Sequence, residues 1–140
     1  MSGVVCPVSM NRAERARDYE AYVELCSVVQ EMDDFVDAIV VEGVHDKEAL
    51  EALGVTKEIA MYSAGFSYAG FVDYLMSRYR RVTILTDYDR AGKKLNRRLT
   101  ASLEREGVKV ENQYRERIGR ILCVRGIRNI ESITSLTKRF

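Results

Sequence analysis

The 140-residue sequence has no tryptophan, one proline and only three cysteines, and these shortages exclude several classes of protein. Cys6, Cys26 and Cys123 are odd in number and widely spaced, which excludes a disulfide framework and a zinc site. Cys26 and Cys123 stand in apolar stretches, and we expect both to be small core residues. His45 is the only histidine, and no serine or cysteine forms a coherent catalytic triad with it.

Long hydrophobic runs are also missing. No stretch approaches the roughly 20 apolar residues that a membrane-spanning helix needs. The N-terminus lacks the basic segment and apolar block of a signal peptide. Hydrophobic residues make up 46% and charged residues 31% of the chain, as in ordinary globular proteins. We therefore expect a cytoplasmic protein with no membrane partner.

The net charge of +1 conceals two halves of opposite sign. Residues 1–89 contain 8 Lys and Arg against 16 Asp and Glu, whereas residues 90–140 contain 14 against 5. A basic surface is typical of proteins that bind polyanions such as nucleic acids. The same asymmetry also fits a solvated surface whose halves neutralise each other after folding. Charge alone leaves both interpretations open.

Strand-like and helix-like segments alternate along the chain. Short β-branched runs are followed by segments with helical spacing of their apolar residues. The predicted strands span residues 38–43, 58–65, 81–87, 108–112 and 121–126, and the predicted helices span 11–35, 45–54, 67–79, 90–107 and 113–120. This order predicts an α/β fold with a parallel sheet covered on both faces. In such sheets, ligands bind at the carboxyl ends of the strands.

Two aspartates follow the strand in the stretch ILTDYDRAG, residues 84–92. Alternate residues of an extended chain point the same way, so Asp87 and Asp89 are able to face one point. Converging carboxylates repel each other unless a cation neutralises them, and Mg²⁺ uses one or two carboxylates together with substrate phosphates. A magnesium site is one interpretation. The other is a turn in which Asp89 caps the following helix.

Glu42 ends another predicted strand, and Gly43 follows it. If the two strands are neighbours, Glu42 and Asp87 share one rim of the sheet. A desolvated glutamate near other carboxylates has a raised pKa and can transfer a proton near neutral pH. The alternative is an ordinary surface acid at a strand–helix turn. Asp46 is predicted either to line this rim or to stabilise a helix start.

A basic helix face is predicted directly after Asp89. Its residues Lys93, Lys94, Arg97 and Arg98 border the carboxylates, where the backbone of a nucleic acid would meet them. A solvated helix face is the alternative interpretation.

Two further residues complete the predicted rim. Ser63 lies at the end of the second strand, and Gly92 follows the aspartate pair. His45 is predicted to be a polar residue at a helix start rather than a substrate contact.

The order and spacing of these motifs are more specific than any one of them. VVEGVHDKEAL, residues 40–50, followed by ILTDYDRAGKKLNRRL, residues 84–99, resembles the Toprim domain. That domain is shared by topoisomerases, bacterial-type primases, 5S ribosomal RNA maturases and old-family nucleases. The stretch DYDRAGKK is most similar to primases, whereas TDYD and EGVHDKEAL are equally similar to the 5S maturases and small archaeal Toprim proteins.

The resemblance implies a three-layer fold with a central, mainly parallel four-stranded sheet. It implies that Glu42 is a general acid or base and that Asp87 and Asp89 hold Mg²⁺. The implied function is Mg²⁺-dependent phosphodiester chemistry on RNA or DNA, as a nuclease or a related phosphoryl transferase. The alternative is a module that binds nucleic acid or a ribonucleoprotein without catalysis.

We expect three segments along the chain. Residues 36–126 would form the Toprim domain, and residues 127–140 a C-terminal segment of unassigned structure. Residues 1–35 would form a loose tail and a helical extension, in which Asn11 and Glu14 have the pattern of a capping box. This helix would either pack on the sheet or build a homodimer, and the protein is also a candidate for association with a larger nucleic-acid-processing complex.

Overall fold

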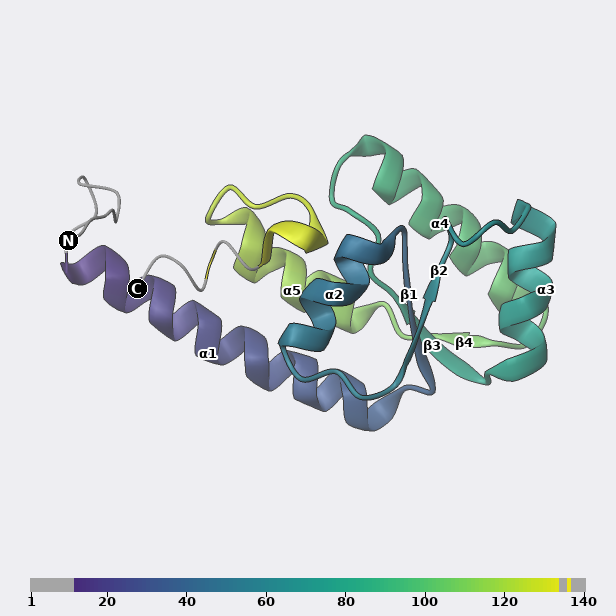
Figure 1. The fold of residues 1–140 in the computed structure, drawn as a ribbon, viewed down its shortest axis with the longest axis horizontal. Coiled ribbons are helices and arrows are strands. Elements are labelled where there is room, and N and C mark those ends of the chain that lie inside the picture. Colours follow the sequence, from purple (N-terminus) through teal and green to yellow (C-terminus); the bar gives the residue numbers. More distant parts are fainter. Residues whose placement is uncertain (1–11, 134–135, 137–140) are drawn as a thin grey trace.

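The structure of the chain is a computed structural model that describes residues 12–133 and residue 136. The predicted cap at Asn11 and the predicted tail lie outside these residues. Helices and strands alternate after a long first helix (Figure 1). Their bounds are α1 (Arg12–Phe35), β1 (Ala38–Val41), α2 (Val44–Ala52), β2 (Glu58–Met61), α3 (Tyr68–Arg78), β3 (Arg81–Ile84), α4 (Arg90–Arg105), β4 (Lys109–Val110), α5 (Gln113–Cys123) and the short 3₁₀-helix η1 (Ile130–Ser132).

All the described strands form one parallel four-stranded sheet in the order β2-β1-β3-β4. Val40 of β1 lies beside Ala60 of β2 on one side and Ile84 of β3 on the other. Each connection between consecutive strands contains a helix, as parallel pairing requires. The predicted α/β fold with a central parallel sheet is therefore confirmed.

Two hydrophobic clusters, one on each face of the sheet, give the fold three layers. Val40 of β1 belongs to the cluster formed with α3 and α4, in which Phe71 and Leu99 are fully buried. Its neighbour Ile39 belongs to the other cluster, which contains residues of α1, α2 and α5. Successive side chains of a strand point to opposite faces, so burial on both sides requires the continuous apolar run seen in β1.

The long helix α1 is part of the core. Leu25 and Met32 are 0% exposed and share a cluster with Ile118 and Leu122 of α5. α1 runs along α5, and its first turns extend beyond the sheet (Figure 1). Although α1 has 24 residues, neither it nor another helix in the described part of the chain has the length and hydrophobicity to cross a membrane. A homodimer through α1 stays a prediction.

The predicted strand at residues 121–126 is wrong. Ile121 and Leu122 continue α5, which ends at Cys123, and a turn with Gly126 at a φ of 75° follows. Ile121 and Leu122 lie three and four residues after the buried Ile118, so they extend the apolar stripe of a helix. A short apolar run has the same local pattern in a strand and in a buried helix.

The other elements occur where they are predicted, with shorter strands. The predicted strands 58–65 and 81–87 end at Met61 and Ile84, and the strand predicted at 108–112 is reduced to two residues. The prediction that Cys123 is a core residue is wrong, because this side chain is exposed on α5. Cys26 is half-buried, and Cys6 lies outside the described residues.

The docking of α1 is testable by truncating a buried side chain. Leu25→Ala should lower the free energy of unfolding by about 2–5 kcal/mol, because it removes core contacts and leaves a cavity. Val23→Ala is the matched control on the same helix, since Val23 is 50% exposed and its truncation should change stability by less than about 0.5 kcal/mol. Urea denaturation measures both. Equal, small effects would contradict the packing described for α1.

Candidate functional site

Glu42 and Asp87 meet at the carboxyl edge of the sheet. Glu42 directly follows β1, Asp87 lies just beyond β3, and these strands are neighbours. The Glu42 carboxylate oxygen Oε2 accepts a hydrogen bond of 2.8 Å from the backbone N–H of Asp87. The two sequence motifs, 45 residues apart, are therefore joined by a direct contact.

The Asp87 side chain is held by a segment from the C-terminal part of the chain. Its Oδ1 accepts a hydrogen bond of 3.0 Å from the backbone N–H of Ile130, at the start of η1. The backbone N–H of Tyr88 donates to the carbonyl oxygen of Arg128 at 2.7 Å. Residues 128–130, to which the sequence assigned no structure, therefore form one wall of the rim.

Asp89 caps α4. Its Oδ1 accepts a hydrogen bond of 2.7 Å from the backbone N–H of Gly92, and its side chain is exposed. The turn interpretation of Asp89 is therefore realised in the structure. A cap uses one carboxylate oxygen, so capping does not preclude a cation at the other oxygen.

Asp46 also has a local structural partner. Its Oδ2 accepts a hydrogen bond of 3.0 Å from the backbone N–H of Gly43 at the start of α2. The residue is buried, and burial followed by repulsion from Glu131 raises the pKa of the Asp46 carboxyl. Asp46 lies close enough to the rim to raise the pKa of Glu42 as well.

The electrostatics of the rim are those of crowded carboxylates. Burial raises the pKa of Glu42, the hydrogen bond from the Asp87 N–H opposes this rise, and repulsion from Asp87, Asp46 and Asp89 adds to it. The pKa of Asp87 is raised chiefly by burial and further by Asp46 and Asp89, against the opposing effects of the Ile130 N–H and of Arg115. A cation at this rim would relieve the repulsion, because it favours the charged form of each acid.

The donor set fits Mg²⁺ in chemistry. Carboxylate oxygens are the hard ligands that Mg²⁺ prefers, and this ion needs only one or two of them when it keeps its waters. Across residues 12–133 and 136, no three His, Cys, Asp or Glu side chains are placed as a ready-made ligand set. Asp87 and Asp89 would therefore hold the ion with water or substrate oxygens in the remaining positions.

Residues 86–89, here called the site loop, are fastened to the first turn of α4. The Thr86 hydroxyl donates to the carbonyl oxygen of Gly92 at 2.6 Å. A Cβ atom added at Gly92 would clash with the carbonyl oxygen of Asp87, closer than any real side chain approaches a backbone atom. Gly92 therefore serves the rim by allowing this close approach.

Arg115 and Tyr88 fasten the site loop to α5, and neither is predicted from the sequence. The Arg115 Nη2 donates to the carbonyl oxygens of Asp87 at 2.6 Å and Thr86 at 3.1 Å. The Tyr88 hydroxyl donates to the Arg115 carbonyl oxygen at 2.6 Å, and the guanidinium lies over the Tyr88 ring. The available signal is that Arg115 stands on the same helical face as the buried Ile118, where a charge needs partners.

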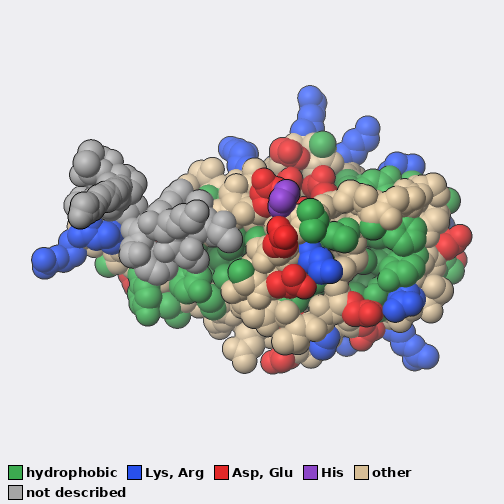
Figure 2. All heavy atoms as spheres, in the orientation of Figure 1, with side chains coloured by type: hydrophobic (Ala, Val, Ile, Leu, Met, Phe, Trp, Pro, Cys, Tyr) green, Lys and Arg blue, Asp and Glu red, His purple; other side chains and the backbone are tan. Residues whose placement is uncertain are grey.

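Ser63 and His45 lie beside the rim at the surface. Ser63 is exposed, and its backbone N–H donates to the Glu42 carbonyl oxygen at 3.0 Å. His45 is exposed in the first turn of α2 and contacts the Glu48 carboxylate at 3.1 Å. In Figure 2 its single purple side chain lies among red acidic side chains.

The basic face predicted on α4 is divided in the structure. Lys93, Lys94, Arg97 and Arg98 are all exposed. The Arg98 guanidinium lies 3.7 Å from the centroid of the Tyr68 ring, toward α3. Lys93 and Arg97 instead line a cavity between α4 and α5. These residues therefore offer cations in two directions.

Comparison with known proteins agrees with this geometry. Residues 37–113 match the Toprim domain, so the chain belongs to the Toprim family. It is 34% identical over 121 residues to a UPF0292 protein of Thermococcus gammatolerans, with 86% of each chain covered. It is 31% identical over 122 residues to one from Methanocaldococcus jannaschii, covering 86% of this chain and 94% of that protein.

A solved structure also shares the fold. A protein from Aquifex aeolicus has a TM-score of 0.61 and 30% identity, over 82% of this chain and 96% of the Aquifex chain. The Toprim domain associates the protein with metal-dependent functions related to nucleic acids in general. The names of these relatives state no specific activity.

The raised pKa of Glu42 predicts a pH-dependent gain in stability from Glu42→Gln. Glutamine keeps an oxygen acceptor for the Asp87 N–H but removes the repelling charge. Ionising Glu42 opposes folding as the pH rises from its unfolded-state pKa of about 4.3 through its raised folded-state pKa. The variant should gain roughly 0.5 kcal/mol at pH 7 without divalent cations, a small value because solvent screens the partly exposed group.

Urea denaturation at several pH values measures this gain. The gain should vanish about one pH unit or more below the unfolded-state pKa, because Glu42 is then protonated in both states. Asp73→Asn is the control, since Asp73 is an exposed acid on α3 away from the rim. A gain that is equal at low and neutral pH would contradict the electrostatic cause.

Gly92→Ala tests the close approach of α4 to the site loop. In an ordinary helix this change stabilises by about 1 kcal/mol. Here it should instead destabilise by about 1–3 kcal/mol, because the new methyl group meets the Asp87 carbonyl and overpacks the site. Thermal or urea unfolding provides the measurement. Ala101→Gly, at an exposed position of α4, gives the ordinary helical cost for comparison, and a stabilised Gly92→Ala variant would show that the contact is absent.

Proposed function

We propose that this Toprim protein carries out Mg²⁺-dependent phosphodiester chemistry on RNA or DNA, as a nuclease or a related phosphoryl transferase. The observation that carries the proposal is the hydrogen bond between Glu42 and the Asp87 backbone, which brings a proton-transfer group beside two further acids. Carboxylates that converge on one point repel each other unless a cation neutralises them, so this crowding favours a metal-dependent site.

Glu42 is the proposed general acid or base. Its Oε2 is held by the Asp87 N–H, so the carboxylate has a fixed orientation and Oε1 is the atom that would take or give the proton. Its raised pKa brings the carboxyl closer to neutral pH, where a proton-transfer group works best. Arg115 supports this arrangement because it anchors the loop that supplies the N–H donor.

Asp87 and Asp89 are the residues proposed to hold Mg²⁺. When bound, the ion would neutralise charge on the phosphodiester and lower the pKa of a water molecule. Asp87 is kept in place by Ile130, and Asp89 by the first turn of α4. Lys93 and Arg97, at the start of the same helix, would contact the neighbouring phosphates.

A second candidate function is binding without turnover. It is favoured by the helix-capping role of Asp89 and by the absence of a preassembled ligand set among the described residues. In that case nucleic acid or a ribonucleoprotein would be bound through the basic residues alone.

The test separates metal binding from proton transfer. Asp87→Asn and Asp89→Asn should weaken Mn²⁺ binding, measured by calorimetry, by at least about tenfold, which corresponds to 1.4 kcal/mol. Asn caps helices as well as Asp does, so Asp89→Asn should keep its stability, whereas Asp89→Ala should lose about 1 kcal/mol. Glu42→Gln should slow Mg²⁺-dependent cleavage of structured RNA or single-stranded DNA by about 10²–10⁴-fold.

Asp73→Asn is the matched control for all three measurements, because it removes one exposed carboxylate outside the rim. Cleavage that survives Glu42→Gln would contradict the acid–base role. Equal Mn²⁺ affinity in the two rim variants and the control would contradict the metal site. Nucleic-acid binding without any metal-dependent turnover would establish the second candidate function.

A further inference from the structure

A cleft between α4 and α5 leads to the site loop. It consists of two cavities of about 530 Å³ and 480 Å³ that share the lining residues Lys93, Arg115 and Glu116. The second cavity also reaches Tyr88 of the site loop. We call the two cavities together the α4–α5 cleft. Its position connects the start of the basic helix with the loop that carries the two aspartates.

The α4–α5 cleft carries an excess of positive charge. Its cations are Lys93, Arg97, Arg115, Arg120 and Arg128, and its anions are Glu104 and Glu116. The cations come from α4, from α5 and from the segment before η1, so they surround the space rather than forming one helix face. A concave surface with one predominant sign of charge concentrates ligands of the opposite sign.

These cations have no acidic partners of their own. Among residues 12–133 and 136, none of Lys93, Arg97, Arg120 and Arg128 takes part in an ion pair. Unpaired cations on two walls of one cleft are available to an anionic ligand. Their number and spread favour a chain of phosphates over a single anion.

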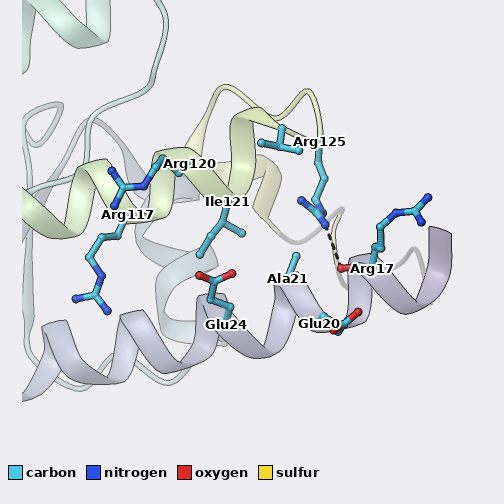
Figure 3. A pocket seen from close by; sticks show the side chains of 9 residues that line it. Arg17, Glu20, Ala21, Glu24, Arg117, Arg120, Ile121 and Arg125 are labelled. Atoms are coloured by element: carbon cyan, nitrogen blue, oxygen red, sulfur yellow. Dashed lines mark hydrogen bonds between the residues drawn. The ribbon is translucent and has the colours of Figure 1, made fainter. Parts of the chain in front are cut away.

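The neighbouring cavity between α1 and α5 provides the contrast (Figure 3). It too is lined by arginines, but Arg117 is paired with Glu31 and Arg125 with Asp18. Glu20 and Glu24 of α1 also line this cavity. These two ion pairs hold α1 in place, whereas Arg120, which lines this cavity as well as the α4–α5 cleft, takes part in no ion pair among the described residues.

Arg115 joins the α4–α5 cleft to the candidate site. The residue is only 7% exposed, and its Nη2 donates to the Asp87 carbonyl oxygen at 2.6 Å. Its Nε has no hydrogen-bond partner in the described part of the chain, and its guanidinium forms no ion pair there. A buried cation without a carboxylate partner adds to the positive potential of the cleft, because little solvent screens it.

We propose that the α4–α5 cleft binds the sugar–phosphate backbone of a single-stranded segment of nucleic acid and leads it to the site loop. The choice of nucleic acid as ligand rests on the proposed function. The inference adds Arg120 and Arg128 as residues that contact its phosphates. The proposal commits to a single strand because its flexible backbone can follow a cleft between two helices, whereas a duplex is stiff over such a length. The path excludes Lys94 and Arg98, which do not line the cleft.

The test compares pairs of substitutions that remove equal charge. Fluorescence anisotropy with labelled single-stranded RNA and DNA of about a dozen nucleotides, in EDTA, measures affinity at several salt concentrations. Arg120→Gln with Arg128→Gln should weaken binding about tenfold. The plot of log affinity against log salt has a negative slope, and the same pair should make it shallower by about 1.4, or about 0.7 for each lost phosphate contact.

Two further pairs serve as comparisons. Arg105→Gln with Lys109→Gln removes two exposed charges at the far end of α4 and in β4, and should change affinity less than twofold. Lys94→Gln with Arg98→Gln should lose less affinity than the Arg120 and Arg128 pair. Because EDTA removes divalent ions, this measurement does not depend on metal binding or turnover, so failure of the cleft and failure of the proposed chemistry are distinguishable.

Cys123 provides a position-specific probe, because its exposed thiol lines the cleft. Saturating single-stranded nucleic acid should slow alkylation of Cys123, followed by peptide mass spectrometry, by at least about fivefold. Unchanged Cys123 reactivity at saturation would overturn the proposal. Equal losses in all three pairs, a larger loss in the Lys94 and Arg98 pair, or tighter binding of a duplex than of either strand would also overturn it.

Discussion

The candidate site depends on the hydrogen bond between the Glu42 carboxylate and the Asp87 backbone N–H. It forms because β1 and β3 are parallel neighbours, so their carboxyl ends lie at the same edge of the sheet. The bond uses a backbone donor and therefore holds a glutamate beside an aspartate without neutralising either charge. The buried clusters on both faces of the sheet compensate for the repulsion that follows.

The site loop is held by contacts from three directions. Gly92 allows the first turn of α4 to approach the Asp87 carbonyl, Arg115 of α5 binds the same carbonyl, and Ile130 binds the Asp87 side chain. These partners fix the positions of the acids, because each supplies a backbone or guanidinium hydrogen bond. Residues 128–130, which lie before and at the start of η1, therefore belong to the site, and η1 packs against α2.

The fold brings acids and cations of the two oppositely charged halves of the chain to neighbouring parts of the surface. Glu42, Asp46 of α2 and the two acids of the site loop gather at the rim, whereas cations from α4, α5 and residue 128 line the adjoining cleft. The sequence left two interpretations of this asymmetry open, a polyanion partner or mutual neutralisation. Mutual neutralisation occurs where α1 packs against α5, since Arg117 and Arg125 are paired with acidic residues of α1 there. The α4–α5 cleft has cations without such partners, which favours a polyanion there.

The sequence by itself determined the layout of the protein. The periods of two and 3.6 residues predict the alternating strands and helices, and the rule for parallel sheets places Glu42 and Asp87 at one rim. The error at residues 121–126 arose because a short apolar run does not distinguish a strand from a buried helix. Only the tertiary structure decided the partners of the site loop, since Arg115 and Ile130 reach it from 28 and 43 residues away along the chain. Contacts at such separations depend on how helices pack, and no local pattern encodes them.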